Sequence, residues 1–435
     1  MRKSIIENIK SIVLGILIIL SIYLYMIVFF QNPIESYFGF ISTSFLNQDD
    51  NKNLTDISII TTINPRKVIY IENKSLLKVV FSNDDLYKSI INGFIDEIKR
   101  NILTNNYKID DYYADFKKDD AQKYINFEYS YFLNIHLFSQ TLFNKDIFKN
   151  MMPFFFDKVY IYKSDGSLKI CFMNSTIQKA VVISINDGAS WIADIMDKID
   201  SQNSNIFSYA SSLGWSDLAP EDALIPIKLS NLRLYEVKVK ASESKKNILI
   251  KRLFGDTLFT RTSIDSSGNS IITDERKELV LKRDGSYQFT ILDKLPENKM
   301  DIRKAILFYL ANFYFGDEVY INSIYQFNNE TEIIMNLKID GIDAEVFSNK
   351  EFVRIVLNDG YLTKIEGILL DIEKGRRTYI DIDGVSAIDK LKETNGNIYM
   401  HRIDLKYILS NNLNSYPLWE IKTKNGVIYI DAINN

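Results

Sequence analysis

Histidine and cysteine are scarce in this sequence, and this scarcity limits the chemistry that it can support. Among 435 residues there are two histidines, His136 and His401, and one cysteine, Cys171. The chain therefore has too few of these residues for a typical Ser-His-Asp or Cys-His catalytic arrangement. It also has too few for a zinc site of closely spaced His and Cys. We predict no catalytic residue, no metal site and no bound cofactor. A single cysteine also allows no disulfide within the chain, so packing alone must hold the fold.

Two serine-lysine pairs match a catalytic spacing without the rest of its motif. Ser75 with Lys78, and Ser242 with Lys245, have the S-x-x-K spacing of penicillin-binding enzymes, but no K-T-G sequence follows. The first pair lies in a strand-like stretch and the second at the start of a predicted helix. We interpret both pairs as ordinary structural residues.

Two acidic runs are weak candidates for calcium binding. Residues 340–343 and 381–384 alternate aspartate with small or apolar residues, yet they lack the further oxygen ligands and the final glutamate of an EF-hand loop. We interpret them as turns and helix caps. His136 and His401 are interpreted as surface or structural residues, and Cys171 as a buried apolar side chain.

One long uncharged run lies near the N-terminus, from Ile12 to Phe30. At about 1.5 Å of rise per residue it would form a helix of roughly 29 Å, close to the thickness of a bilayer's hydrocarbon core. The run ends in bulky residues, which favours a retained anchor over a cleaved signal peptide. Basic residues precede it, so the positive-inside rule puts the N-terminus in the cytoplasm. We predict a cytoplasmic segment 1–10, a transmembrane helix 11–30 and a single-pass protein of the cell membrane.

Small residues in this segment suggest a contact with another helix. Ser11 and Gly15 are four residues apart and form a small-x-x-x-small face, with Ser21 further along. Such faces let helices pack closely in lipid, although small residues are common in membrane helices in general. We predict that Ser11, Gly15 and Ser21 form a transmembrane contact.

The remainder of the chain has the composition of a globular ectodomain. The sequence is 46% hydrophobic and 25% charged, with a net charge of -4, which argues against nucleic acid as a partner. Residues 31–62 are polar and are predicted to form a stalk. Beyond it we predict an α+β fold: antiparallel sheets with helices packed on one face, in modules 63–200, 201–297 and 298–435.

Periodicity predicts the main elements of the first module. Apolar residues recur every four positions from Leu86 to Ile102, which indicates a helix that begins near Ser82 and lies on a sheet. Residues 125–137 alternate strictly between an apolar set and a mainly polar set, which predicts one long strand. Segments 158–162 and 168–173, on either side of an Asp-Gly turn, predict a hairpin.

The later modules repeat the order of strand, helix and hairpin. Helices are predicted at 243–254 and 301–313, with a final helix beginning near Ser386. The predicted strands are 232–239, 279–282, 287–291, 320–327, 332–339, 352–357, 362–371, 417–422 and 427–432.

The whole pattern resembles the YycH family, accessory regulators of the WalK/WalR (also YycG/YycF) cell-wall two-component system of low-GC Gram-positive bacteria. The resemblance covers a basic N-terminus, one membrane helix and a large external region. It rests locally on the runs 253–256, 272–274 and 283–287, and on a closing part similar to YycI and PepSY-like domains at 387–391, 416–421 and 426–432.

This resemblance implies a non-enzymatic regulator that contacts a YycI-like single-span partner and a WalK-type sensor kinase. Two alternatives remain open from the residues alone. One is an anchored envelope protein with a structural or binding role, and the other is a cell-wall hydrolase that uses a pair of carboxylates.

Overall fold

The computed structural model describes residues 63–433, apart from gaps at 73–75, 83, 111–122, 144, 165, 187–188, 203–204, 220–222, 230–231, 256–259, 347–350, 396–398 and 411–412. The predicted cytoplasmic segment, transmembrane helix and stalk lie outside the described residues, as do Ser11, Gly15 and Ser21. Among the residues that are described, no helix has both the length and the apolar character needed to cross a bilayer. The anchor and its contact residues stay predictions.

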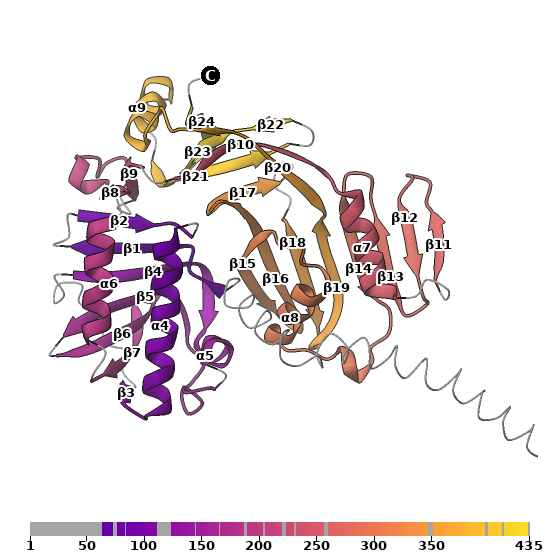
Figure 1. Ribbon diagram of the computed structural model, residues 1–435, viewed down its shortest axis with the longest axis horizontal. Helices are drawn as coiled ribbons and strands as arrows, with labels where there is room; N and C mark the ends of the chain where they lie inside the picture. Colours follow the sequence, from indigo (N-terminus) through magenta and orange to yellow (C-terminus); the bar gives the residue numbers. More distant parts are fainter. Residues whose placement is uncertain are drawn as a thin grey trace, which may run out of the picture.

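The first large sheet has nine antiparallel strands and lies at the left of Figure 1. Its spatial order is β3-β7-β6-β5-β4-β1-β2-β8-β9. Helices α4 (Asp85–Leu103) and α6 (Ala189–Gln202) lie side by side across one face, and α5 (Ile135–Phe143) follows β4 (Figure 1). The strands are β1 (Lys67–Glu72), β2 (Leu76–Val80), β3 (Tyr107–Asp110), β4 (Lys123–Asn134), β5 (Phe155–Ser164), β6 (Ser167–Asn174), β7 (Lys179–Ile185), β8 (Ile206–Tyr209) and β9 (Leu224–Lys228).

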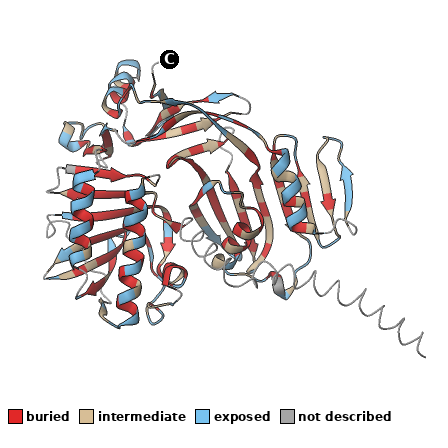
Figure 2. Ribbon diagram, in the orientation of Figure 1, coloured by how far each residue is buried: buried red, intermediate tan, exposed pale blue. Residues whose placement is uncertain are grey.

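An apolar stripe fixes α4 on this sheet. The helix begins at Asp84, whose carboxylate accepts a hydrogen bond from a backbone N–H of the first turn. Ile90, Phe94 and Ile98 are buried, and Phe94 meets Phe127 of β4 edge to face with ring centroids 5.1 Å apart. Figure 2 shows buried strands beneath helices whose outer sides are exposed. The predicted arrangement of helix on sheet is confirmed.

The second large sheet has twelve strands, in the order β11-β12-β13-β14-β19-β18-β16-β17-β21-β23-β24, with β15 paired to β16. All neighbours are antiparallel except β17 and β21, which are parallel. Its helices are α7 (Glu243–Phe254), α8 (Ile302–Asn312) and α9 (Gly384–Asn395). The strands are β11 (Arg261–Ile264), β12 (Ser270–Thr273), β13 (Lys277–Leu281), β14 (Ser286–Ile291), β15 (Glu318–Phe327), β16 (Glu330–Ile339), β17 (Ile342–Val346), β18 (Val353–Asn358), β19 (Tyr361–Ile368), β21 (Met400–Leu409), β23 (Pro417–Thr423) and β24 (Gly426–Asp431).

A small third sheet, β20-β10-β22, lies at the upper side of the second large sheet (Figure 1). β10 (Leu234–Ala241) pairs with β20 (Leu370–Thr378) and with β22 (Asn414–Ser415). The hydroxyl of Tyr407 on β21 donates to the backbone oxygen of Tyr235 at 3.0 Å, which ties the small sheet to the large one.

The predicted hairpins are confirmed, as is the start of α7 after Ser242. The cap of α4 is Asp84 and not Ser82, and α9 begins at Gly384, two residues before Ser386.

The strand predicted for 125–137 ends early. It stops at Asn134, and Ile135 begins α5. The side-chain oxygen of Asn134 accepts from the backbone N–H of His136 at 2.9 Å, so an asparagine cap interrupts the alternating pattern. His136 therefore lies on a helix, and its Nδ1 is 3.0 Å from a carboxylate oxygen of Asp146.

The strand predicted at 362–371 is two strands, because the chain leaves the large sheet at Leu369 and continues as β20. The module boundaries stay predictions, and the sheets cross them. β8 and β9 join the first sheet from beyond residue 200, and β11 to β14 belong to the same sheet as the C-terminal strands.

Candidate functional site at the junction of the two large sheets

Arg66 and Lys67 stand at the start of β1 and are held firmly on the first sheet. The backbone N–H of Arg66 donates to the backbone oxygen of Glu128 on β4 at 2.7 Å. The hydroxyl of Tyr87 on α4 donates to the backbone oxygen of Pro65 at 2.5 Å. These bonds fix the backbone on both sides of Arg66, so its guanidinium extends from a fixed segment of the chain.

Two carboxylates of the second large sheet lie opposite Arg66 and Lys67. Asp343 lies on β17 and is in register with Lys406 on the parallel strand β21. Asp404 is two residues before Lys406 and therefore lies on the same face of β21. The parallel pairing of β17 with β21 thus brings together two aspartates that are distant in sequence.

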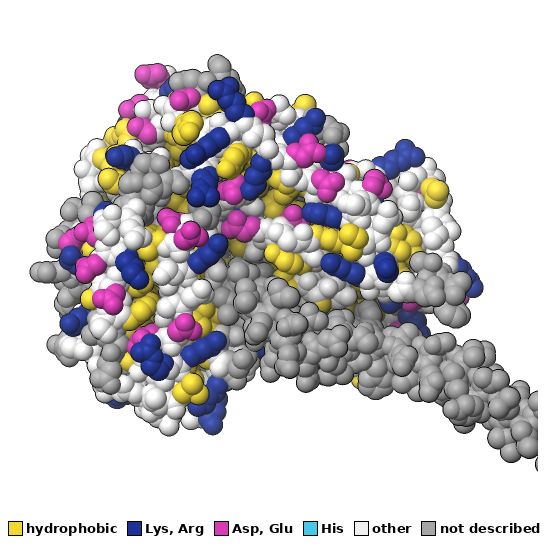
Figure 3. All heavy atoms as spheres, viewed as in Figure 1, with side chains coloured by type: hydrophobic (Ala, Val, Ile, Leu, Met, Phe, Trp, Pro, Cys, Tyr) yellow, Lys and Arg dark blue, Asp and Glu magenta, His cyan; other side chains and the backbone are white. Residues whose placement is uncertain are grey.

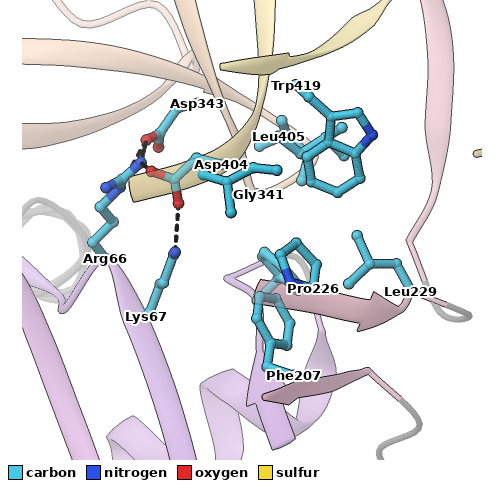
Figure 4. Close-up of a pocket in the computed structure, with 13 residues that line it drawn as sticks. Arg66, Lys67, Phe207, Pro226, Leu229, Gly341, Asp343, Asp404, Leu405 and Trp419 are labelled. Carbon is cyan, nitrogen blue, oxygen red and sulfur yellow. Dashed lines mark hydrogen bonds and ion pairs between the residues drawn. The ribbon is translucent and has the colours of Figure 1, made fainter. Parts of the chain in front are cut away.

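The four charges form what we call the junction cluster: Arg66, Lys67, Asp343 and Asp404 (Figure 4). Arg66 Nε donates to Asp343 Oδ2 at 2.8 Å, and Arg66 Nη2 lies 2.5 Å from the same oxygen and 3.3 Å from Asp404 Oδ2. Lys67 Nζ lies 2.5 Å from Asp404 Oδ1. Side-chain exposure is 13% for each cation and 4% for Asp404, so these pairs are largely shielded from water.

The electrostatics of the cluster favour the charged forms. Burial alone would raise the pKa of the Asp404 carboxyl, but the charges of Arg66 and Lys67 outweigh it and hold that pKa below its usual value. Burial likewise opposes the charge of Arg66, yet Asp343 and Asp404 raise the pKa of its guanidinium. Each of these two groups therefore favours the charged form of the other.

A second polar contact crosses the junction beside the first. Ser82 donates to Glu318 Oε1 on β15 at 2.8 Å. Lys338 of β16 is buried, donates to Ser82 Oγ at 3.3 Å and lies over the ring of Tyr320 at 4.7 Å. Burial lowers the pKa of the Lys338 ammonium.

Apolar side chains complete the junction next to the cluster. Phe207, Pro226 and Leu229 approach from the first-sheet side, opposite Leu405 and Trp419 (Figure 4). They surround a cavity of about 30 Å³, which has room for one or two water molecules. Small-molecule sites are about tenfold larger or more, so this geometry suits a contact between two parts of the chain rather than a ligand site.

The weak catalytic motifs have structural roles in the fold. Ser242 Oγ accepts from the backbone N–H of Lys245 and caps α7, while Lys245 Nζ pairs with Asp317 at 3.0 Å. Lys78 Nζ donates to Asp200 at 2.7 Å, and Ser75 lies outside the described residues.

The structure also places the remaining candidates. Cys171 is buried in β6, and burial raises the pKa of its thiol to about 12. Asp383 accepts from Ser386 N–H at 2.7 Å and caps α9. His401 lies on β21 and is exposed. Within the described part of the chain, no group of His, Cys, Asp and Glu could hold a metal ion.

Sequence reasoning did not identify the junction cluster. It singled out Asp343 only as a weak calcium candidate, and it attached no role to Arg66, Lys67 or Asp404. The available signal was the alternation of charged Asp404 with the apolar Ile403 and Leu405, which is typical of one face of a strand. That signal identifies a face of the strand but no partner.

Known proteins are similar to this chain in structure but not detectably in sequence. No family model matches the chain, and no curated protein matches its sequence. The crystal structure of YycH from Bacillus subtilis is similar over 85% of this chain and 96% of that chain, with a TM-score of 0.59 and 15% identity. An uncharacterized protein from Eubacterium rectale matches 47% of this chain and 84% of that chain, with a TM-score of 0.30 and 14% identity. The chain therefore has a YycH-like fold.

Proposed function

We propose that this protein is a membrane-anchored, extracytoplasmic accessory regulator of a WalK-type sensor histidine kinase, and that it acts through protein contacts. The observation that carries the proposal is the likeness to YycH over 85% of the chain. The predicted N-terminal helix and a YycI-like single-span partner belong to the same proposal.

The junction cluster gives this proposal a mechanism. Arg66 and Lys67 are the first charged residues of the described chain, directly after the predicted stalk. They are bound to the first sheet through their backbone and to the second sheet through their side chains. A change in the second sheet would therefore act on the segment that leads to the membrane helix. In this way the ectodomain biases which of two kinase states the helix packs against.

The visible surface is in keeping with local protein contacts. Figure 3 shows Lys and Arg interspersed with Asp and Glu over one face of the molecule. A mixed surface of this kind gives no strong field of one sign to attract a polyanion. Recognition then depends on particular local surfaces.

Co-purification from membranes tests the proposal. The full-length protein with an affinity tag is expected to retain the sensor kinase and the single-span partner in mild detergent, and its deletion is expected to change a kinase-dependent reporter. An unrelated single-span protein with the same tag is the control. Absence of kinase from the purified material, together with an unchanged reporter, would falsify the proposal and favour an envelope-binding or hydrolytic role.

The predicted helix contact has its own test. Replacing both Ser11 and Gly15 with Leu is expected to reduce co-purification of the kinase, because the larger side chains prevent close helix approach. Replacing both Val13 and Leu17 with Ile is the matched control, since these residues have the same spacing on the opposite side of the helix. Equal co-purification of both variants would remove Ser11 and Gly15 from the contact.

A further inference from the structure

Strand β11 forms an exposed end of the twelve-stranded sheet, beyond the part of the sheet next to α7 (Figure 1). Among the described strands it pairs only with β12. All four of its residues are exposed, as Figure 2 shows in pale blue, and Ile264 keeps 72% of its surface accessible. Free edges are usually protected by proline or charge. β11 contains no proline, and its one charge, Arg261, is paired with Glu275 at 2.9 Å.

The register identifies the backbone groups on the free side. The N–H of Asp265 donates to the backbone oxygen of Asn269 at 3.0 Å, which makes these two residues a hydrogen-bonded pair. Such pairs alternate along an antiparallel ladder, so Ser263 directs its N–H and C=O toward β12. Thr262 and Ile264 direct theirs away from the sheet. A further strand could therefore bond to both residues without disturbing β12.

A groove of about 610 Å³ lies beside this edge, between α7 and the strands β11 to β13. Lys282 and Arg283 line it, are exposed, and form no ion pair with another described residue. Gly268 in the turn between β11 and β12 leaves the space that the Arg283 guanidinium occupies. Glu243 and Lys246 also line the groove, but they pair with each other at 2.6 Å, so Lys282 and Arg283 leave the groove with a net positive charge in a chain whose net charge is -4.

We propose that the free edge of β11 and this groove bind an extended, acidic peptide segment of another protein, which adds to the sheet as a strand. Backbone groups of Thr262 and Ile264 provide the ladder bonds, and alternate acidic side chains of the peptide meet Lys282 and Arg283. A second copy of β11 suits the site less well, because the strand itself carries Arg261 and no acidic residue. This inference depends on β11 and the groove, and does not require the proposed function.

Two variants of the full-length protein in lipid nanodiscs separate the backbone and charge contributions. Ile264→Pro removes an outward N–H while leaving the bonds to β12 in place, since proline is tolerated on the open side of an edge strand. Ile264→Thr keeps the N–H and is its matched control. Lys282→Glu combined with Arg283→Glu reverses the charge in the groove without changing the strand.

Selection from a random peptide library displayed on phage is the test, with counter-selection on Ile264→Pro. Acidic segments without proline are expected to be enriched. As labelled synthetic peptides, they are expected to bind Ile264→Pro and the charge-reversed protein at least about tenfold more weakly than wild type or Ile264→Thr.

Enrichment of basic or neutral peptides, or equal binding to wild type and to the charge-reversed protein, would overturn the proposal. A dimer of the wild-type protein that disappears in Ile264→Pro would also overturn it, because the occupant would then be a second copy of the chain. If Ile264→Pro fails to fold, the charge-reversed variant decides the outcome alone.

Discussion

Arg66 and Asp343 are 277 residues apart in sequence, yet Nε of the first donates to Oδ2 of the second at 2.8 Å. The bond joins the first strand of one sheet to a strand of the other. Since Asp404 lies beside Asp343 and accepts from Lys67, one small cluster determines how the two sheets meet. The cluster is therefore one of the contacts that hold the two large sheets together, beside the contact of Ser82 with Glu318.

Replacement of Asp404 by Asn is expected to destabilise the protein strongly. The carboxylate is nearly inaccessible, and its loss leaves Arg66 and Lys67 with one fewer negative partner in a poorly hydrated site. Removing one partner from a buried ion pair costs about 3–5 kcal/mol. Urea unfolding followed by circular dichroism measures the change. Asp389→Asn, which breaks an exposed pair with Lys392, is the control and is expected to change stability by less than about 1 kcal/mol.

Acid is expected to weaken the same contact. The pKa of Asp404 is lowered in the folded protein from its ordinary value of 3.8, so the unfolded state binds the proton more readily. The contribution of the ionised Asp404 to the free energy of unfolding is complete at neutral pH. It is lost as the pH falls below about 4 toward the lower pKa of the folded state. Urea midpoints measured at successive pH values should fall more steeply for wild type than for Asp404→Asn in this range. Parallel curves would mean that other carboxyl groups govern the acid sensitivity.

Local patterns in the sequence were sufficient for most of the second large sheet and for the starts of α7 and α8. The strongest signals were Asp-Gly turns between alternating strands, and Ser or Asp before an apolar helical stripe. Ser242 and Asp301 accept from backbone N–H groups at the starts of α7 and α8, close to where the pattern predicted helices to begin. These features depend on neighbours within a few residues, which is why one sequence is enough to find them.

Other elements were missed even though a signal was present. Helix α6 has buried Ile192, Ile195, Met196 and Ile199 at helical spacing, but the polar residues that follow led us to predict a module boundary in this region. For the junction cluster the sequence pattern does not identify the contact, because its partners come from strands far apart in sequence. Periodicity indicates which face of a strand a charge lies on, but not which strand lies opposite.

Replacement of Lys338 by Met is expected to stabilise the protein at neutral pH. The buried ammonium has a serine hydroxyl at 3.3 Å and the Tyr320 ring as partners, and its desolvation is not compensated by a direct ion pair with a described residue. Removing this desolvation penalty is expected to raise the free energy of unfolding by roughly 1 kcal/mol at pH 7. Because burial lowers the pKa of Lys338, the penalty declines as the pH rises toward the unfolded value of 10.5, and the advantage of Met should decline with it.

Urea unfolding at pH 7 and near pH 10 measures this difference. Lys374→Met is the control, since Lys374 is half exposed and pairs with Asp340 on the surface. A loss of stability at both pH values would instead mean that Glu318 and Asp343 depend on the charge of Lys338.

Replacement of Gly384 by Ala is expected to separate α9 from β9. A Cβ at this position would lie 2.6 Å from the backbone oxygen of Pro226, closer than any real contact of that kind, so one of the two elements must move. Overpacking of this sort costs about 1–3 kcal/mol. Hydrogen exchange should become faster in β9, while β5 and β6, at the centre of the first sheet, keep their protection. Gly375→Ala is the matched control, because its nearest neighbour is Glu236 Oε2 at 3.4 Å, an ordinary contact distance. If both alanine variants exchanged alike, close approach at Gly384 would have no role in holding the two large sheets together.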